Sequence, residues 1–148
     1  MYDFEKIILL TQLTSTFGMT GLIWFVQLSH YPLFARVGRE GFVEYERSHS
    51  IRTTIVVAPL MLAEAATTVL LFQLVPDWIS FRSAAWGTAL LMAVWVSTAT
   101  LQVPQHERLS EGFDSSAWRT LVRTNWIRTV AWSARSVLLI QCLWQLLK

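Results

Sequence analysis

Residues 54–75 read TIVVAPLMLAEAATTVLLFQLV, an apolar run that is interrupted by one charged side chain, Glu64. A helix needs about 20 predominantly apolar residues to cross the hydrocarbon core of a bilayer. This stretch is long enough to do so. The sequence therefore predicts a membrane-spanning helix that carries an ionisable group within the bilayer.

Three further stretches share this length and character, namely residues 7–27, 84–103 and 129–147. Because each crossing takes the chain to the other side of the membrane, consecutive helices run in opposite directions. The sequence predicts an all-α fold, an integral membrane antiparallel four-helix bundle, formed by residues 1–148 as a single domain.

The composition agrees with a membrane protein. Of the 148 residues, 53% are hydrophobic and only 15% are charged, whereas a soluble domain has about 25% charged residues. The sequence pI is about 9.0, but the formal net charge is only +2. Arginines that flank apolar spans are typical of membrane orientation, so we expect no nucleic-acid partner. The one cysteine, Cys142, excludes an internal disulfide and a CxxC motif.

The basic residues are distributed unevenly around the spans. The two loops after the first and third spans, with the start of the fourth, hold eight arginines, and the opposite side holds only Lys6, Arg82 and Lys148. Cytoplasmic loops carry the excess of lysine and arginine. The pattern predicts a protein of the cytoplasmic (inner) membrane with both loops in the cytoplasm and both termini outside.

Polar residues recur at helical spacing in all four helices, as residues on one helix face do. The four sets are Gln12, Ser15, Thr16, Gln27 and His30; Glu46, His49, Thr53 and Glu64; Thr88, Trp95, Thr98 and Gln102; and Asn125, Arg128, Trp132 and Arg135. A polar side chain in lipid is stable only beside another polar group or water. The sequence therefore predicts a polar bundle interior.

The depths of Glu64 and Arg135 predict an ion pair. Glu64 lies twelve residues beyond Arg52, and Arg135 lies twelve beyond Arg123, which is about 18 Å of helix in each case. Both helices run in the same direction, so the two side chains reach a similar level. An unpaired charge there costs several kcal/mol. The pair either fixes helix register or has a functional role, such as proton relay or anion binding.

Local signals next to the spans predict further helical structure. Residues 38–50 have helical spacing, so we expect one long helix that continues through residues 54–75 and kinks near Pro59, which lacks a backbone donor. Asp114, followed by two serines, is typical of a helix N-cap before the fourth span. His106 follows Pro104 closely, in a stretch that we interpret as a loop.

All three histidines are expected at the cytoplasmic end of the bundle. His30 ends the first span, His49 precedes the second, and His106 follows the third. Glu46 and His49 have the Glu-x-x-His spacing of di-iron bundles, although those bundles use two such motifs. Imidazole nitrogens bind zinc, copper, iron and heme iron.

Three interpretations of this cluster stay open. The first is a transition-metal site with the ligands His30, Glu46, His49 and His106, or a heme bound by His30 and His49. The second is a metal-free site for a polar organic substrate. The third is a structural role, in which the histidines are solvated or hydrogen-bonded at the membrane interface.

Three features of the first half of the chain are the stretch Gly21-Leu-Ile-Trp-Phe-Val-Gln-Leu-Ser-His30, the run Phe42-x-x-Tyr45-Glu46-Arg47, and Thr54 with Pro59. In this layout the chain resembles two families of small four-helix membrane proteins, the anthrone oxygenase-like group and the membrane protoporphyrinogen oxidase of bacterial heme synthesis. The resemblance implies an oxidoreductase with roles for His30 and Glu46. The second family is expected to use an intramembrane lysine, and this chain has only Lys6 and Lys148, both terminal.

The first function that we expect is a membrane oxidoreductase, metal- or heme-assisted, that acts on a lipophilic small molecule. Asn125 and Arg128 would bind an anionic or carbonyl group of the substrate, and Glu64 with Arg135 would tune or relay protons. The alternative is a non-enzymatic carrier, channel or ligand-binding protein that uses the same polar interior, or an accessory subunit. The expected partners are the lipid bilayer, the lipophilic molecule and a second copy of the chain in a homo-oligomer.

Overall fold

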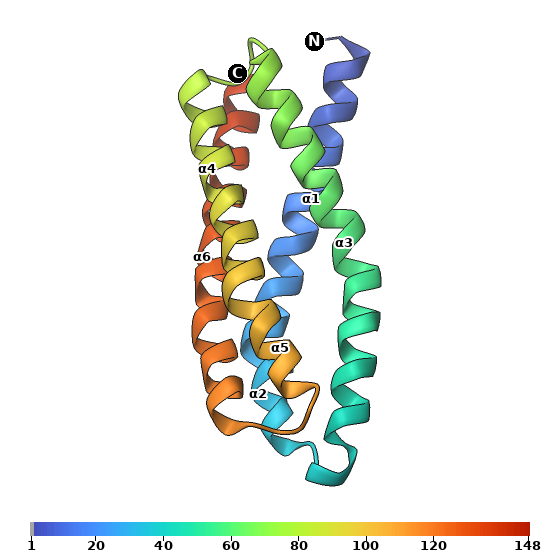
Figure 1. Cartoon of the computed structure of the whole chain (residues 1–148). Helices are drawn as coiled ribbons and strands as arrows, with labels where there is room; N and C mark the ends of the chain where they lie inside the picture. The colour runs from blue at the N-terminus through green and yellow to red at the C-terminus, as the bar shows by residue number, and fades with distance from the viewer. Residues whose placement is uncertain (1) are drawn as a thin grey trace.

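The computed structural model describes residues 2–148, which fold as an all-α bundle with no strands among them. Four helical segments run up and down, and the two chain ends lie at the same end of the bundle (Figure 1). The first segment comprises α1 (Asp3–Phe25), the π-helical turn η1 (Val26–His30), α2 (Tyr31–Leu33) and the 3-10 turn η2 (Phe34–Arg36). The others comprise the 3-10 turn η3 (Arg39–Gly41) with α3 (Phe42–Leu74); α4 (Phe81–Ser97), the π-helical turn η4 (Thr98–Gln102) and α5 (Val103–Leu109); and α6 (Ser115–Leu146).

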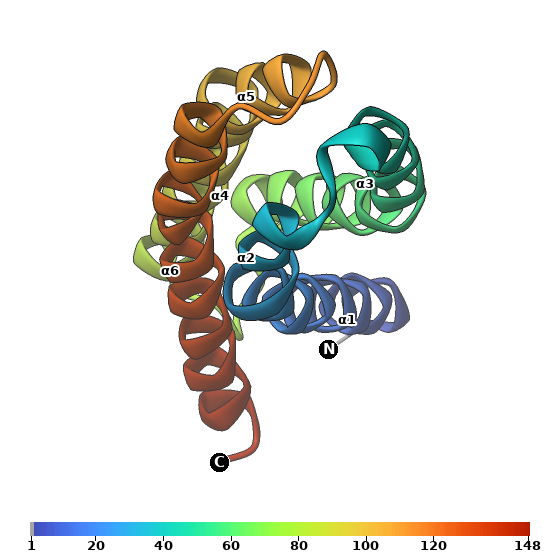
Figure 2. The same ribbon diagram turned by 90° about the horizontal axis from the view of Figure 1, so that it is seen from below.

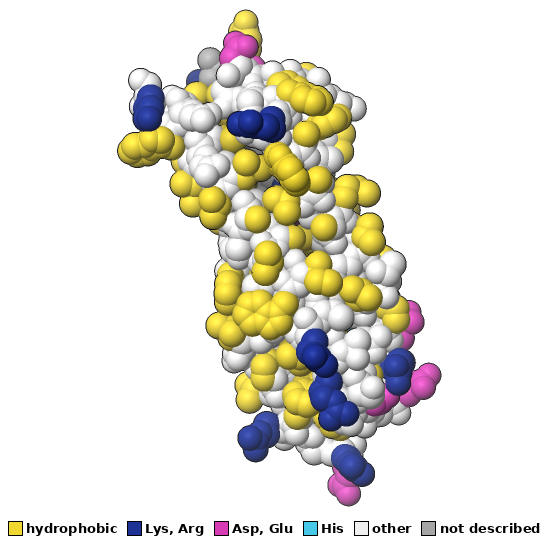
Figure 3. All heavy atoms as spheres, turned by 90° about the vertical axis from the view of Figure 1, so that its left-hand side faces the viewer, with side chains coloured by type: hydrophobic (Ala, Val, Ile, Leu, Met, Phe, Trp, Pro, Cys, Tyr) yellow, Lys and Arg dark blue, Asp and Glu magenta, His cyan; other side chains and the backbone are white. Residues whose placement is uncertain are grey.

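Within residues 2–148, three helical segments are long and apolar enough to cross a membrane: Asp3–Arg36, Arg39–Leu74 and Phe81–Leu109. The fourth, α6, is one residue shorter than α3 and carries four arginines. Its crossing stays a prediction. On the face drawn in Figure 3, charged side chains gather toward the two ends of the molecule, and the zone between them has hydrophobic side chains and no charged ones.

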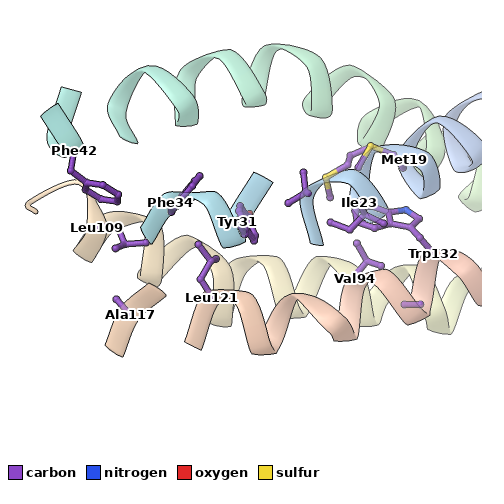
Figure 4. Packing of buried hydrophobic residues seen from close by; sticks show 13 residues of the cluster. Met19, Ile23, Tyr31, Phe34, Phe42, Val94, Leu109, Ala117, Leu121 and Trp132 are labelled. Carbon is purple, nitrogen blue, oxygen red and sulfur yellow. The ribbon is translucent and has the colours of Figure 1, made fainter. Parts of the chain in front are cut away.

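The helices pack in a ring in which α1 contacts α3 and α6, and α4 contacts α6 and α3. Seen along the bundle, α2 lies between α3 and α6 (Figure 2). Figure 4 shows two groups of buried side chains in the larger core: Met19, Ile23, Val94 and Trp132 midway along the bundle, and Phe34, Phe42, Leu109 and Leu121 toward the loops. The polar site described below lies between and beside these groups.

The long second helix is confirmed. Residues Phe42–Leu74 form one continuous helix with Pro59 inside it, and Figure 1 shows α3 bending about halfway along its length. Proline bends a helix because it has no N–H to donate and its ring crowds the preceding turn. The expected N-cap is also present, since the Asp114 carboxylate accepts hydrogen bonds from the amides of Ser116 and Ala117.

Each π-helical turn ends two residues before a proline. The amide of Tyr31, just before Pro32, donates to the carbonyl of Val26. In the third segment, Val103 also precedes a proline and donates to the carbonyl of Thr98. A proline ring clashes with the carbonyl four residues back, and hydrogen bonds that reach five residues back make room for it. The extra residue rotates the side chains that follow by about 100° around the helix axis.

The interpretation of the segment around His106 as a loop is wrong. Residues Val103–Leu109 form α5, with Pro104 in its first turn. Proline is favoured there because the first amides of a helix need no intrahelical partner. The helix gives His106 a fixed direction, which a loop would not.

Candidate functional site

A cavity of about 670 Å³ lies between α3 on one side and η4, α5 and α6 on the other. Its size is within the range of small-molecule pockets. The wall is mainly apolar, but Tyr31, His49, His106 and Arg128 all line it. Three other lining residues, Ile51, Leu62 and Val103, are also exposed on the outside of the bundle. The cavity therefore opens sideways, between α3 and the α4–α5 segment.

Three side chains form a hydrogen-bonded chain that ends at the cavity. His106 Nδ1 lies 2.5 Å from Glu46 Oε1, and His106 Nε2 lies 2.9 Å from the hydroxyl of Tyr31. A carboxylate can only accept, so Nδ1 carries the hydrogen and donates it to Glu46. The lone pair of Nε2 then accepts the hydrogen of the Tyr31 hydroxyl. This order of carboxylate, imidazole and hydroxyl is an arrangement that activates the last group as a base or nucleophile.

The other two histidines form a second hydrogen-bonded group beside the first. His30 Nε2 lies 2.8 Å from His49 Nδ1, which also lies 3.1 Å from the hydroxyl of Thr53. The rings of His49 and His106 are 5.5 Å apart between centroids. All three histidines therefore converge at one end of the bundle, as expected.

The expected set of metal ligands, His30, Glu46, His49 and His106, is not arranged as a metal site. Among residues 2–148, no group of three or more His, Cys, Asp or Glu side chains is placed to hold a metal ion. Zinc would need several ligand atoms at about 2.0–2.3 Å from one point. Here the imidazole nitrogens are used in pairs, His30 with His49 and His106 with Glu46. In this arrangement the donor atoms do not fit a metal ion.

The two polar residues at the start of the fourth predicted span have different surroundings. Arg128 lines the cavity and lies over the ring of Trp132, with 5.4 Å between the guanidinium carbon and the ring centroid. Asn125 is fully buried, and its side-chain amide donates to Gln27 Oε1 over 2.9 Å. The structure therefore places Arg128, but not Asn125, at the wall of the cavity.

The predicted ion pair between Glu64 and Arg135 is present. Arg135 Nε lies 2.9 Å from Glu64 Oε1, and both side chains are almost completely buried. Arg135 also donates to Thr68 Oγ1 over 2.9 Å and to the carbonyl of Gly87. Thr16 donates to Glu64 Oε1 over 2.6 Å. Buried charges are stable when both are paired and hydrogen-bonded, and this network meets that condition.

Trp132 connects the ion pair to the cavity. Its indole N–H donates to Glu64 Oε2 over 2.9 Å, and its ring is in contact with the guanidinium of Arg128. The side chain is fully buried between the two groups. Trp132 therefore lies between the buried ion pair and the cavity.

Sequence reasoning missed Tyr31. The residue follows His30 directly and precedes Pro32, so it reads as an aromatic residue at a helix end. Its role depends on the π-helical turn before it and on α5 bringing His106 within hydrogen-bond distance. A tyrosine that follows the last histidine of a span at the level of other titratable residues is the only signal that could have indicated it.

Comparison of the chain with protein-family models, with curated proteins and with solved structures finds no match. The class of protein is therefore defined by the fold and the site: an all-α bundle with apolar helices and a lateral cavity whose inner end carries tyrosine, histidine and arginine side chains.

Proposed function

We propose that this chain is a membrane-embedded enzyme that binds a lipophilic small molecule in the cavity and exchanges protons with it through Tyr31. All four helical segments cross the bilayer, including α6, with both loops in the cytoplasm and both termini outside. The arginines of α6 are compatible with this crossing. Arg119 and Arg123 lie near its cytoplasmic end, Arg135 is neutralised by Glu64, and Arg128 lies in the cavity wall.

The position of the cavity supports a substrate that arrives from the lipid. Its opening is flanked by Ile51, Leu62 and Val103, which are exposed apolar residues of membrane-spanning segments. A molecule dissolved in the bilayer can enter between α3 and α4 without crossing the headgroup region. Its polar group would then reach the inner end of the cavity, where polar side chains fix its orientation.

The proton-transfer step uses the chain's own residues. Tyr31 takes a proton from a hydroxyl or an acidic C–H of the substrate while its own phenolic proton passes to His106 Nε2. Glu46 stays a carboxylate and stabilises the imidazolium that forms, because its oxygen accepts the hydrogen bond from His106 Nδ1. The reverse step returns the proton to the product. General acid–base catalysis of this kind contributes about 10²–10⁴-fold in rate.

Oxidation or reduction of the substrate is the reaction class that the sequence favours. The residues of the site supply proton transfer only, because the single cysteine, Cys142, lies outside the cavity wall. An electron acceptor or donor would be a second molecule, so the step that we propose for this chain is the proton transfer alone.

The second candidate function is a carrier that moves a lipophilic molecule without changing it. The lateral opening of the cavity favours this function as well. A carrier needs entry from the lipid and a binding site for the ligand, but it does not need the chain from Glu46 to Tyr31. The observation that favours the enzyme is therefore this chain of short hydrogen bonds, which ends at a cavity-lining hydroxyl.

Binding in the cavity can be tested with a pair of neighbouring substitutions. Val57 lines the cavity, whereas Val56 is exposed and is not part of its wall. The lipophilic molecules that co-purify with wild type, Val57→Trp and Val56→Trp are extracted and compared by mass spectrometry. We expect one molecule to be lost from Val57→Trp alone. Equal retention by all three proteins would contradict binding in this cavity.

A further inference from the structure

Two arginines on one face of α6 differ in whether a neighbouring carboxylate neutralises their charge. Arg128 and Arg135 lie seven residues apart, or two helical turns. Arg135 is paired with Glu64. Among residues 2–148, no carboxylate oxygen lies within 4.0 Å of the Arg128 guanidinium. The charge of Arg128 is therefore not neutralised by a neighbouring side chain.

Arg128 is nevertheless buried. Only 7% of the residue is exposed, and its Nε is a buried donor without a hydrogen-bond partner. Its guanidinium lies over the ring of Trp132 and near the hydroxyl of Tyr31, and neither of these groups carries a full negative charge at neutral pH. A buried charge is normally paired, and a buried donor normally has an acceptor. Because Arg128 lines the cavity, a ligand in the cavity can supply both the counter-charge and the acceptor.

We propose that the ligand is an amphiphilic carboxylate, with its head group on Arg128 and its apolar tail along α3. This inference rests on the proposed function, because it names the substrate class of the same cavity. A guanidinium presents donors in a fork that matches the two oxygens of a carboxylate. A single negative charge is favoured over a phosphate dianion, since Arg128 is the one buried cation of the cavity wall. The two other charged lining residues, Arg47 and Glu107, are exposed and opposite in charge.

The shape of the cavity agrees with a head and a tail. Its lining extends along α3 from Arg47 to Leu62, which are fifteen residues apart, or about 22 Å along the helix. Val57, Met61 and Trp95 line the part beyond the polar end. An alkyl or isoprenoid tail can lie along these side chains and leave through the opening beside Leu62.

The proposal is tested by equilibrium binding to the protein in nanodiscs at pH 8, with empty nanodiscs subtracted. The probes are radiolabelled dodecanoate, methyl dodecanoate and dodecyl phosphate. Wild type is compared with Arg128→Lys, Arg128→Gln and the control Arg123→Gln, which changes an exposed arginine of the same helix. Val57→Trp measures the binding that depends on the cavity.

We expect wild type and Arg123→Gln to bind dodecanoate at least tenfold tighter than the methyl ester and tighter than the phosphate. Arg128→Lys should keep part of this preference, and Arg128→Gln should bind acid and ester alike. Equal affinity of wild type for acid and ester, or a tighter phosphate, would overturn the carboxylate proposal while leaving a lipophilic site intact. If Val57→Trp weakens the binding of none of the three probes, the proposed function is overturned as well. The acid-to-ester ratio of wild type decides the matter even where an Arg128 variant fails to fold.

Discussion

His106 Nδ1 lies 2.5 Å from Glu46 Oε1, although the two residues are 60 positions apart in the sequence and belong to different helical segments. The contact fixes the direction of the imidazole and the nitrogen that carries its hydrogen. Because of it, the other nitrogen is free to accept from Tyr31. The carboxylate of Glu46 is fully buried, and its Oε1 also accepts from the hydroxyl of Ser50 over 3.3 Å. Its second oxygen has no hydrogen-bond partner among the described residues.

This contact predicts a distinctive hydrogen resonance. A hydrogen held between an imidazole nitrogen and a carboxylate at this distance is strongly deshielded, because the bond is charge-assisted. NMR of histidine-labelled protein should show a downfield Nδ1–H signal from His106. Tyr31→Phe should keep the signal, whereas Glu46→Gln should move it upfield. A His106 that is protonated on Nε2 alone in wild type would show that the order of donors proposed here is wrong.

The ion pair predicts a non-additive effect on stability. Glu64→Gln leaves the buried guanidinium of Arg135 without a counter-charge. This substitution should therefore lower the free energy of unfolding in detergent by about 3–5 kcal/mol. The double variant Glu64→Gln with Arg135→Gln should recover part of that loss. Thermal or denaturant unfolding measures the effect, with Glu44→Gln as the control because Glu44 is exposed. Additive single and double effects would mean that the two charges do not interact.

The N-cap of α6 predicts that the stability of the folded protein falls at acidic pH. The amides of Ser116 and Ala117 hold the pKa of the Asp114 carboxyl below its usual value, and the guanidinium of Arg108 adds to this. A depressed folded-state pKa contributes stability above the unfolded-state pKa, and this stability is lost as the pH falls through the folded-state pKa. The contribution is therefore complete at neutral pH and is lost below about pH 4.

A comparison of two Asp114 variants measures this contribution. Asp114→Ala should lower the melting temperature at pH 7 and should have a smaller effect at pH 3, where part of the stability from the wild-type carboxylate has been lost. Asp114→Asn should keep most of the stability at pH 7, since its amide oxygen can still accept from the two backbone amides. Equal losses from Asp114→Ala at both pH values would argue against the cap as a charged acceptor.

The orientation in the membrane predicts a labelling pattern. Single cysteines at Glu40 and Asp77, in a background in which Cys142 is replaced by alanine, lie at opposite ends of α3. The excess of arginine near Glu40 predicts that this end is cytoplasmic. In intact cells, a membrane-impermeant thiol reagent should label position 77 and not position 40. The reverse result would invert the proposed orientation.

Much of the fold follows from local patterns. The helices come from apolar runs of sufficient length, and Glu64 and Arg135 were expected to meet because their depths match and neither charge is stable alone. The π-helical turns could not be predicted in this way, since they depend on how each proline ring fits against its own helix. The reading of residues around His106 as a loop failed for the same reason: Pro104 starts a helix there instead of ending one.

Apart from Tyr31, the residues that gather at the site can be predicted from the sequence. The hydrogen bonds between them cannot. The histidines lie next to the same ends of three successive predicted spans, which places His30, His49 and His106 at one end of the bundle, and the structure agrees. The sequence does not give the distances between helices, so it could not distinguish metal ligation from direct pairing of His106 with Glu46. It also could not show that Asn125 bonds to Gln27 and leaves Arg128 as the unpaired cation at the cavity.

The most direct test of the account is the effect of Tyr31→Phe on a lipophilic substrate. Wild type and Tyr31→Phe, each in nanodiscs, are incubated in D2O with a total lipid extract, and every component is followed by mass spectrometry. We expect that wild type converts one component or labels it with deuterium, and that Tyr31→Phe still retains this component without changing it. A Tyr31→Phe protein that acts on the component as fast as wild type, or a wild type that binds it and never changes it, would contradict the proposed role of Tyr31.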